Sequence, residues 1–536
     1  MDHIYDVLII GSGGAGLSAA LEAKKNSDNI VVLSKTHPTM SQTAQAQGGI
    51  NGVLNDSEED IAKHIFDTTK SSHKIGDDDT IKLMCENAKN TIQWLDDLGV
   101  PFSRDDKNEI TQRNFGGSSK PRTCYSSDYT GLKILHTLYD SCLKENIKFL
   151  NEYLVLGFIK DTDLNEIRGI QTLNIISGEV SQIFAKSIII ASGGYGGVYH
   201  NYSTNSTATT GEVLNAALEI GCELENMEFV QFHPTSLKQN RILISESARG
   251  EGGYLVDQHG DRFIDELKPR DEVSRAIYEK IKNGDSIYLD LRHIGAKELQ
   301  ELMPQEYNLT YEFTGLKMDQ HIIEITPSTH YTMGGIKVNI DAKTNIKNLY
   351  ACGESASTRV HGANRLGGNS LLEIITFGRI AGKNASLNTH NITNFSTKSY
   401  TNLLNILEND FKDIFSLPNK INFQIVKNEL GKLLFEKVGL FKDEKNLQEA
   451  LLSVQKFEKQ LPLMGIEDKS KTCNTELKEF IEFQNMIKLT QTIILSAINR
   501  KESRGAHYRT DFLKEDSTYN LSTKISKQNN ELKVIV

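Results

Sequence analysis

The first residues with a clear chemical use form a glycine-rich turn near the N-terminus, Gly11-Ser12-Gly13-Gly14-Ala15-Gly16. Gly11, Gly13 and Gly16 have the GxGxxG spacing, which lets backbone N–H groups approach a pyrophosphate closely at the start of a helix. The motif is specific only between a strand and a helix. Here an apolar run over 5–10 precedes it and an Ala- and Leu-rich run over 17–25 follows it, so the sequence predicts a dinucleotide site.

The residues after the second predicted strand, 30–33, discriminate between dinucleotides. NAD-binding proteins usually place an acidic residue there to bind the ribose. This chain has Ser34 and Lys35 instead, which removes the NAD contact but can serve the ribose and phosphate region of FAD. Two later glycine-rich segments, 188–194 and 349–354, each follow an apolar strand and favour the longer cofactor, FAD.

These segments define the elements that must position the site. We interpret 188–194 and 349–354 as returns of the chain to one parallel sheet, and the helical periodicity after residue 400 as a separate helical part. The expected fold is α/β, with a Rossmann-like FAD-binding domain, an inserted α+β capping domain and a C-terminal helical domain. The expected limits are 1–227 and 348–395 for the FAD-binding domain, 228–347 for the capping domain, 396–500 for the helical domain and 501–536 for a polar C-terminal tail.

Composition narrows the class of protein. Among 536 residues, Lys and Arg number 60 and Asp and Glu 70, a net charge of −10 that argues against nucleic-acid binding. No apolar run approaches the roughly 20 residues of a membrane-spanning helix, and no basic leader is visible, so we expect a cytoplasmic chain. The six cysteines form no CxxC pair, so we expect reduced thiols, no metal site and no iron–sulfur ligands within this chain.

Further motifs follow the glycine turn in a fixed order, and together they resemble a known family. They are Ser34-Lys35-Thr36-His37-Pro38-Thr39, Ser41-Gln42-Thr43-Ala44-Gln45-Ala46-Gln47-Gly48-Gly49, Gln112-Arg113-Asn114-Phe115-Gly116-Gly117, Phe232-His233-Pro234-Thr235, Ser245-Glu246-Ser247-Ala248-Arg249-Gly250-Glu251-Gly252-Gly253, Pro269-Arg270-Asp271, His330-Tyr331-Thr332-Met333-Gly334-Gly335, His361-Gly362-Ala363-Asn364-Arg365-Leu366-Gly367-Gly368-Asn369-Ser370 and Glu502-Ser503-Arg504-Gly505-Ala506-His507. The series resembles the flavoprotein subunit of succinate dehydrogenase and fumarate reductase, and their relative L-aspartate oxidase. The resemblance is close over about 1–390 and near 500–512.

The resemblance implies hydride exchange between FAD and the C2–C3 bond of a four-carbon dicarboxylate. It makes Arg270 the proton donor and acceptor, with Glu246 and Arg249 as its proton relay. An arginine has a pKa above about 12, so it can act as an acid only if its proton is replaced as it leaves. The implied substrate-binding residues are His233, Thr235, His330, Arg365 and Phe115, with Arg365 as the bidentate carboxylate clamp.

The resemblance also implies which residues contact the flavin. Glu212 stands where the family usually has Asp and is expected to contact the adenosine part. The full expected set is Gly11, Gly13, Gly14, Ala15, Gly16, Ser34, Lys35, Ser41, Gln42, Thr43, Gln47, Gly48, Gly49, Ala191, Ser192, Gly193, Glu212, Glu354, Asn369, Ser370 and Leu371. His3, His64 and His259, outside these motifs, are expected at the surface.

One position departs from the family pattern. Typical succinate dehydrogenases have a histidine between Ser and Thr that bonds covalently to the flavin, and this chain has Gln42. An amide cannot form that bond, so we expect noncovalent FAD. Because the covalent link raises the flavin potential, its absence should favour fumarate reduction over succinate oxidation.

Two alternatives remain open at this point. L-aspartate oxidase also has noncovalent FAD, but its substrate loop carries an acidic residue for the ammonium group, where this chain has Gln112 to Gly117 with the apolar Phe115. Glu109, three residues earlier, keeps that alternative open. A flavin-binding electron relay without dicarboxylate turnover is the other. The resemblance further implies an iron–sulfur partner and a membrane anchor that reaches quinone, with the chain peripheral on the cytoplasmic face of the inner membrane.

Overall fold

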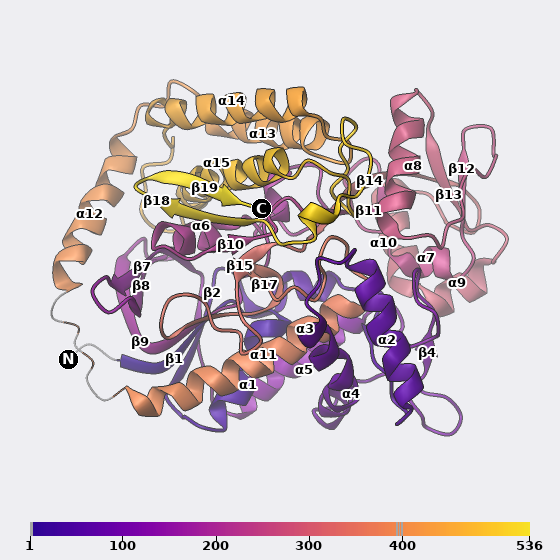
Figure 1. The fold of residues 1–536 in the computed structure, drawn as a ribbon, viewed down its shortest axis with the longest axis horizontal. Helices are drawn as coiled ribbons and strands as arrows, with labels where there is room; N and C mark the ends of the chain where they lie inside the picture. Colours follow the sequence, from indigo (N-terminus) through magenta and orange to yellow (C-terminus); the bar gives the residue numbers. More distant parts are fainter. Residues whose placement is uncertain (1–3, 393–394, 396, 398–399) are drawn as a thin grey trace.

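A computed structural model describes residues 4–392, 395, 397 and 400–536, and a large sheet forms its centre (Figure 1). The apolar runs expected to be strands are strands, and the sheet confirms the α/β class. Its strands lie in the order β6 (Lys148–Asn151), β2 (Ile30–Ser34), β1 (Ile4–Ile10), β9 (Val180–Ile190), β8 (Glu166–Asn174) and β7 (Tyr153–Asp161), and β16 (Leu349–Ala351) also pairs with β9.

The parallel part of this sheet brings three chain segments to one edge. β9 runs parallel to both β1 and β16. The backbone continues the pairing past the strands, since Ala191 N–H donates to the Ile10 carbonyl at 2.8 Å and Cys352 N–H to the Ile190 carbonyl at 2.9 Å. The glycine turn and both later returns therefore meet at the carboxyl end of the sheet, where α/β proteins bind ligands.

Helices cover both faces of the sheet. α1 (Gly14–Lys24) lies against α11 (Asn369–Asn388) and α5 (Thr130–Lys144) on one face. Glycines allow the close approach of α1 and α11, because a Cβ at Gly382 would lie 2.1 Å from the Ala19 carbonyl oxygen. α1 and α11 begin at the carboxyl edge of the sheet, so their N-terminal N–H groups converge there.

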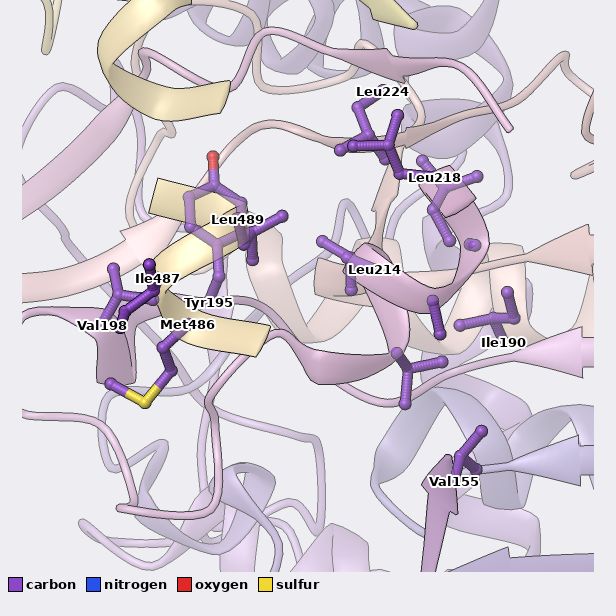
Figure 2. Close-up of a cluster of buried hydrophobic side chains, with 14 of the residues drawn as sticks. Val155, Ile190, Tyr195, Val198, Leu214, Leu218, Leu224, Met486, Ile487 and Leu489 are labelled. Atoms are coloured by element: carbon purple, nitrogen blue, oxygen red, sulfur yellow. The ribbon is translucent and has the colours of Figure 1, made fainter. Parts of the chain in front are cut away.

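On the other face, α6 (Glu212–Glu219) packs against α15 (Thr475–Asn499). Figure 2 shows part of this apolar core, to which both helices and the sheet contribute. The contact is tight at Gly211, where an added Cβ would lie 2.3 Å from Leu489 of α15 and 2.8 Å from Tyr195. The last long helix of the chain thus supports the sheet through α6.

A second, four-stranded sheet forms a separate body on the right of Figure 1. Its order is β11 (Val230–Leu237), β14 (Ile323–Thr332), β13 (Ile287–Asp290) and β12 (Tyr254–Asp257). With it are α7 (Glu246–Gly250), α8 (Arg270–Lys282), α9 (Ala296–Leu302) and α10 (Pro304–Thr314). These elements have an apolar cluster of their own and occupy the stretch expected to be the capping domain.

The remaining elements lie around these two bodies. α2 (Glu58–Ser71), α3 (Asp78–Glu86) and α4 (Ala88–Asp97) follow the first strands. A small sheet of β3 (Ile50–Asn51), β5 (Thr123–Cys124) and β4 (Gln112–Arg113) joins the loop at 48–49 to the loop at 112–117. α12 (Thr401–Ser416), α13 (Phe423–Lys437) and α14 (Glu444–Gln460) precede α15.

The C-terminal segment has a structure that its polarity did not predict. β18 (Lys524–Gln528) and β19 (Glu531–Ile535) form a hairpin that joins β10 (Leu224–Glu225), β15 (Gly335–Lys337) and β17 (Ala356–Ser357) in a five-stranded sheet. Ile525 is buried, and Leu532 and Val534 pack half-buried against the same core, so a short alternating apolar face and backbone pairing with β10 together hold the hairpin.

Two further expectations concern the cysteines and membrane-spanning helices. The six cysteines are free thiols, with Cys473 exposed and the others buried. Among the described residues, no helix combines the length and the apolar character that crossing a bilayer would require.

Candidate active site

A cavity with an empty volume of about 1530 Å³, part of it open to solvent, lies at the carboxyl edge of the main sheet. Residues of the glycine turn, of both glycine-rich returns and of the start of α11 line one end. Residues of the second sheet's body line the other end. The cavity therefore joins the two groups of residues that the motifs singled out.

At two positions of the glycine turn, the backbone accepts no residue other than glycine. Gly11 has φ +112°, and an added Cβ would lie 2.1 Å from the Ala191 carbonyl oxygen. A Cβ at Gly16 would lie 2.0 Å from the Gly11 carbonyl oxygen. Because both contacts are with backbone, they cannot relax. The first turn of α1 faces the cavity, where the Gly14 N–H donates to Thr43 Oγ1 at 3.0 Å, and the start of a helix favours an anion.

Several polar atoms at the cavity wall lack a hydrogen-bond partner among the described residues. They are Ser41 Oγ, Gln47 Oε1, Ser192 Oγ and Arg365 Nε, all buried. Buried polar groups in native proteins are nearly always paired, so these atoms indicate a polar ligand that runs along the cavity. Their spread from the glycine turn to the cap fits a long dinucleotide such as FAD.

Lys35 and Glu212 belong to a buried ion cluster at the cavity's inner end. Lys35 Nζ lies 2.6 Å from Glu212 Oε1 and 2.7 Å from Glu482 Oε1, and Glu482 comes from α15. Burial alone would lower the pKa of Lys35, but the two carboxylates outweigh it and raise that pKa. The helical region thus reaches the predicted cofactor contacts, a role that the sequence did not reveal.

Replacing Lys35 by methionine is expected to lower the free energy of unfolding by about 3–5 kcal/mol, because Glu212 would remain buried without a cation and Glu482 would keep only Lys478, at 3.5 Å. Urea unfolding measures the change. The matched variant Lys238→Met removes an exposed lysine that pairs with Glu324, and it should cost less than about 1 kcal/mol. Equal losses in the two variants would contradict the assignment of the cluster.

Gln42, the residue in place of the flavin-linking histidine, faces the cavity from a short 3-10 helix over Gln42–Gln45. Its Oε1 accepts a hydrogen bond from Ser206 N–H at 2.6 Å. The amide is therefore fixed by the backbone of the opposite loop. It offers no nucleophile, and only its Nε2 remains to contact a ligand.

Arg270 and Glu246 form a buried pair at the other end of the cavity. Arg270 Nε and Nη2 donate to Glu246 Oε2 at 2.8 and 2.5 Å, and Nη1 reaches Gln231 Oε1 at 3.4 Å. Burial would raise the pKa of Glu246, but the charges of Arg270 and Arg249 lower it below its usual value. Glu246 is therefore ionised, and a proton leaving Arg270 can be exchanged along this contact.

Arg249, the third member of the expected relay, is buried but does not line the cavity. Its Nη1 donates to the Glu266 carbonyl at 2.5 Å, while Nε and Nη2 have no partner among the described residues. It lies three residues after Glu246 on α7, so the two charges interact through the helix turn. The structure shows no direct hydrogen bond from Arg249 to Glu246.

Two histidines lie side by side at the cavity wall. The rings of His233 and His330 are 4.9 Å apart between centroids. Burial, followed by the charge of Arg270, lowers the pKa of both well below the usual value, so both are neutral. A 2.9 Å hydrogen bond to Thr204 Oγ1 holds the His330 ring at Nδ1. Neutral imidazoles in this position can donate to a carboxylate without adding charge.

Arg365 supplies the second cation of the cavity. Its Nη1 donates to Ser370 Oγ at 2.8 Å, and its guanidinium carbon lies 4.3 Å from the centre of the Tyr331 ring. Burial, and then the nearby charge of Arg270, lower the pKa of Arg365 to about 9, so it is still charged at neutral pH. Glu246 is the counter-ion of Arg270, and burial raises the pKa of Glu354, the other carboxyl group near Arg365, to about 7. The charge of Arg365 is therefore only partly compensated, which suits an anion.

The loop 112–117 closes the cavity above the Gly48 turn. Phe115 lines the cavity and packs on Gly48, where an added Cβ would lie 2.5 Å from its ring. Gly116 N–H donates to Glu246 Oε1 at 2.9 Å. Glu109, the residue that kept an aminated substrate open, is exposed and does not line the cavity. The loop therefore presents an apolar ring, and not a carboxylate, to the cavity.

The cavity brings together most of the residues that the motifs selected. Among the expected residues, Gly16, Thr235, Arg249 and Asn369 do not line it. Thr235 instead donates its hydroxyl to the Ile244 carbonyl at 2.7 Å and contacts His233, so it supports that ring. Ser245 and Tyr331 line the cavity but were not selected, although each is next to a selected motif residue.

The expectation for one histidine is wrong. His64 is fully buried, and its Nε2 hydrogen-bonds to Asn369 Oδ1 at 3.0 Å. Asn369 also accepts from Asn51 Nδ2 at 2.8 Å, so it anchors the start of α11 rather than facing the cavity. The apolar periodicity of α2 did not signal this because His64 is buried through polar contacts. His259 is exposed, as expected, and His3 lies outside the described residues.

Comparison with known proteins extends these observations. An FAD binding domain family matches residues 6–371, and the C-terminal domain family of fumarate reductase flavoproteins matches residues 427–535. The 8-methylmenaquinol:fumarate reductase flavoprotein subunit of Wolinella succinogenes is 36% identical over 95% of this chain and 86% of its own length. The succinate dehydrogenase flavoprotein subunit of Rickettsia conorii is also 36% identical, over 95% of this chain and 90% of its own.

A solved structure shows the same fold throughout. The flavoprotein chain of an Escherichia coli quinol fumarate reductase variant has a TM-score of 0.95 and 32% identity, over 100% of this chain and 97% of that chain. An adenylylsulfate reductase from Archaeoglobus fulgidus has a TM-score of 0.81 with 16% identity, which is a likeness of fold alone.

Proposed function

This chain belongs to the fumarate reductase and succinate dehydrogenase flavoprotein family, and from this premise we propose that its cavity holds FAD and a four-carbon dicarboxylate and interconverts fumarate and succinate. One observation carries the proposal most directly. The Arg270–Glu246 pair, Arg365 and two neutral histidines line a single cavity that is continuous with the glycine turn. A dicarboxylate needs two charged or hydrogen-bonding ends and a proton source between them, and these residues supply both.

The residues at the cofactor end fit FAD. The Gly11 N–H donates to the Leu33 carbonyl at 2.8 Å, so the start of α1, with Gly13 as its N-cap, would face the pyrophosphate. Lys35 and Glu212 lie where an adenosine part would end. The unpaired polar atoms of Ser41, Gln47 and Ser192 would contact the remaining length. When bound, FAD would supply or accept the hydride of the reaction.

The residues at the cap end would bind and orient the acid. Arg365 would form a charge-assisted, bidentate contact with one carboxylate, while His233 and His330 would donate to carboxylate oxygens. Phe115 would pack on the carbon chain and exclude water. These contacts would fix the double bond beside the Arg270 guanidinium, and such positioning lowers the barrier because the reacting groups are already oriented.

Arg270 would move the proton. Its guanidinium donates a proton to the substrate carbon in fumarate reduction and accepts one in succinate oxidation. In fumarate reduction Glu246 must itself take up a proton from solvent, and it would pass that proton to Arg270 Nη2, 2.5 Å away, to restore the guanidinium. In succinate oxidation the ionised Glu246 would first remove a proton from Arg270, which then accepts one from the substrate carbon. Arg249 would stabilise the charge of Glu246 from the same helix and connect the pair toward Glu266.

We infer from Gln42 that FAD is bound without a covalent link. Precipitating the protein in acid is therefore expected to release all of the flavin into the supernatant, because the Gln42 amide cannot bond to the flavin ring. The absorbance of the supernatant and of the washed pellet measures the division. Flavin that stays with the precipitated chain would contradict the inference.

We also infer that the chain works as a subunit. The relatives cited above are flavoprotein subunits by name, and one of them acts with a menaquinol. Within the described residues, no group of His, Cys, Asp or Glu could hold a metal. The resemblance implies an iron–sulfur partner and a membrane anchor, with this chain at the cytoplasmic face of the inner membrane. Purification of the tagged chain from native membranes should bring these partners with it.

A comparison of substrates tests the proposal. The purified protein should reduce fumarate with reduced viologen as the electron donor and should oxidise succinate more slowly with an artificial acceptor. It should not oxidise L-aspartate, because the only carboxylates among the described residues that line the cap end are Glu246, bound to Arg270, and Glu354, bound to Thr332. Oxidation of L-aspartate without fumarate reduction would contradict the proposal.

A further inference from the structure

Two buried carboxyl groups lie where the second sheet's body meets the rest of the chain, outside the cavity. They belong to Asp128, which lies just before α5, and Glu306, which lies in the first turn of α10. Their exposed fractions are 0% and 1%. The motifs did not select either residue, and the mechanism above does not use them. Burying a carboxyl group costs free energy, so the contacts of these two side chains must offset that cost.

Asp128 caps α10 across the junction. The Glu306 N–H donates to Asp128 Oδ2 at 2.9 Å, while Met303, the residue before the helix, provides no side-chain cap. The first N–H groups of a helix have no partner within the helix and favour a negative charge. The contact therefore fixes the start of α10, an element of the second body, to the loop that leads into α5.

Glu306 extends this contact to the active site. Its side-chain Oε1 accepts a hydrogen bond from Ser245 N–H at 3.1 Å. Ser245 is the N-cap of α7 and directly precedes Glu246, the partner of Arg270. A continuous series of contacts thus runs from Asp128 through the first turn of α10, Glu306 and Ser245 to the proton relay.

We propose that Asp128 and Glu306 are positioning residues, which hold the Glu246–Arg270 pair at the distance from bound substrate that proton transfer needs. The inference rests on the proposed function of that pair. The contacts require a hydrogen-bond acceptor on each side chain and do not require a charge. Burial supports this point, since it raises the pKa of Glu306 to about 7 and also raises the pKa of Asp128.

A glutamine at position 306 keeps the acceptor oxygen, and an alanine removes it. Glu306→Ala is therefore expected to lower kcat for fumarate reduction by about 100-fold, the cost of a small misplacement of reacting groups, with little change in KM. Its solvent isotope effect should rise, because proton transfer becomes slower than the other steps. Glu306→Gln should restore kcat to within about threefold of the unmodified enzyme, since one hydrogen bond is retained. The matched control Glu312→Ala, an exposed residue of the same helix, should change nothing.

A second measurement does not depend on turnover. Hydrogen exchange of the α7 amides, residues 246–250, should become faster in Glu306→Ala and in Asp128→Ala, and stay slow in Glu306→Gln. If Glu306→Ala does not fold, Glu306→Asp, which draws the acceptor back from Ser245, should show the same changes to a smaller degree.

The outcomes separate this inference from the proposed function. An unmodified protein that does not reduce fumarate would contradict the proposed function, while the exchange data would still test the contacts. The positioning role would be overturned by normal kcat and normal exchange in Glu306→Ala. It would also be overturned by a glutamine variant as slow as the alanine variant.

Discussion

Replacing Arg270 by glutamine is expected to lower kcat for fumarate reduction by at least about 1000-fold, because a general acid of this kind typically contributes 10²–10⁴ and the charge beside the developing carbanion is also lost. FAD content should stay at the level of the unmodified protein, since Arg270 lies at the cap end of the cavity and the glycine turn lies at the other end. Steady-state assays with reduced viologen measure the loss.

The glutamine variant has a matched control in the same body of the structure. Arg292 is half-exposed and pairs with Asp290 on the surface, so Arg292→Gln should keep full activity. The result also decides whether the chain is only an electron relay. A relay without dicarboxylate turnover would show no fumarate reduction in any variant, and an Arg270→Gln variant with normal turnover would exclude Arg270 as the proton donor.

Replacing Arg365 by glutamine is expected to weaken fumarate binding to the oxidised protein by about 30- to 5000-fold. Truncating one partner of a buried, hydrogen-bonded charge pair costs about 2–5 kcal/mol, and here a substrate carboxylate would lose its clamp. The change in flavin absorbance on titration with fumarate gives the dissociation constant directly. Oxidised FAD cannot reduce fumarate, so the titration is free of turnover.

The Arg365 and Arg270 variants should affect different quantities, substrate binding and turnover. Arg365→Gln should raise the dissociation constant, whereas Arg270→Gln should mainly lower kcat. Arg379→Gln, on α11 and paired with Glu22, controls for the loss of an arginine near this region and should bind normally. Unchanged fumarate affinity in Arg365→Gln would remove Arg365 from the substrate site.

The cofactor end could be predicted from the sequence because its requirements are local. Gly11 must have a positive φ and must lie against Ala191, and only glycine tolerates both, so the motif itself reports the backbone. The apolar strands before residues 191 and 352 placed the other two turns at the same edge. The resemblance then supplied the cap residues, of which Arg270, Glu246, His233, His330 and Arg365 do share one cavity.

What the sequence did not predict depends on contacts between distant polar residues. Glu482 reaches Lys35 from α15, although 447 positions separate them, and neither residue breaks the helical or strand pattern around it. Glu306 and His64 are likewise buried by hydrogen bonds to residues distant in the sequence, Ser245 and Asn369, and the apolar pattern of their own helices does not indicate these partners. The C-terminal hairpin is held by backbone pairing with β10 and by only three apolar side chains, Ile525, Leu532 and Val534, in an otherwise polar segment.

The structure of the protein with FAD and fumarate bound tests the central claim most directly. Fumarate should lie between the flavin ring and the Arg270 guanidinium, with one carboxylate on Arg365 and with His233 and His330 in hydrogen-bonding distance of its oxygens. The flavin should be unlinked, with Gln42 beside it. Fumarate bound elsewhere, or an Arg270 side chain turned away from its carbon–carbon double bond, would contradict the account.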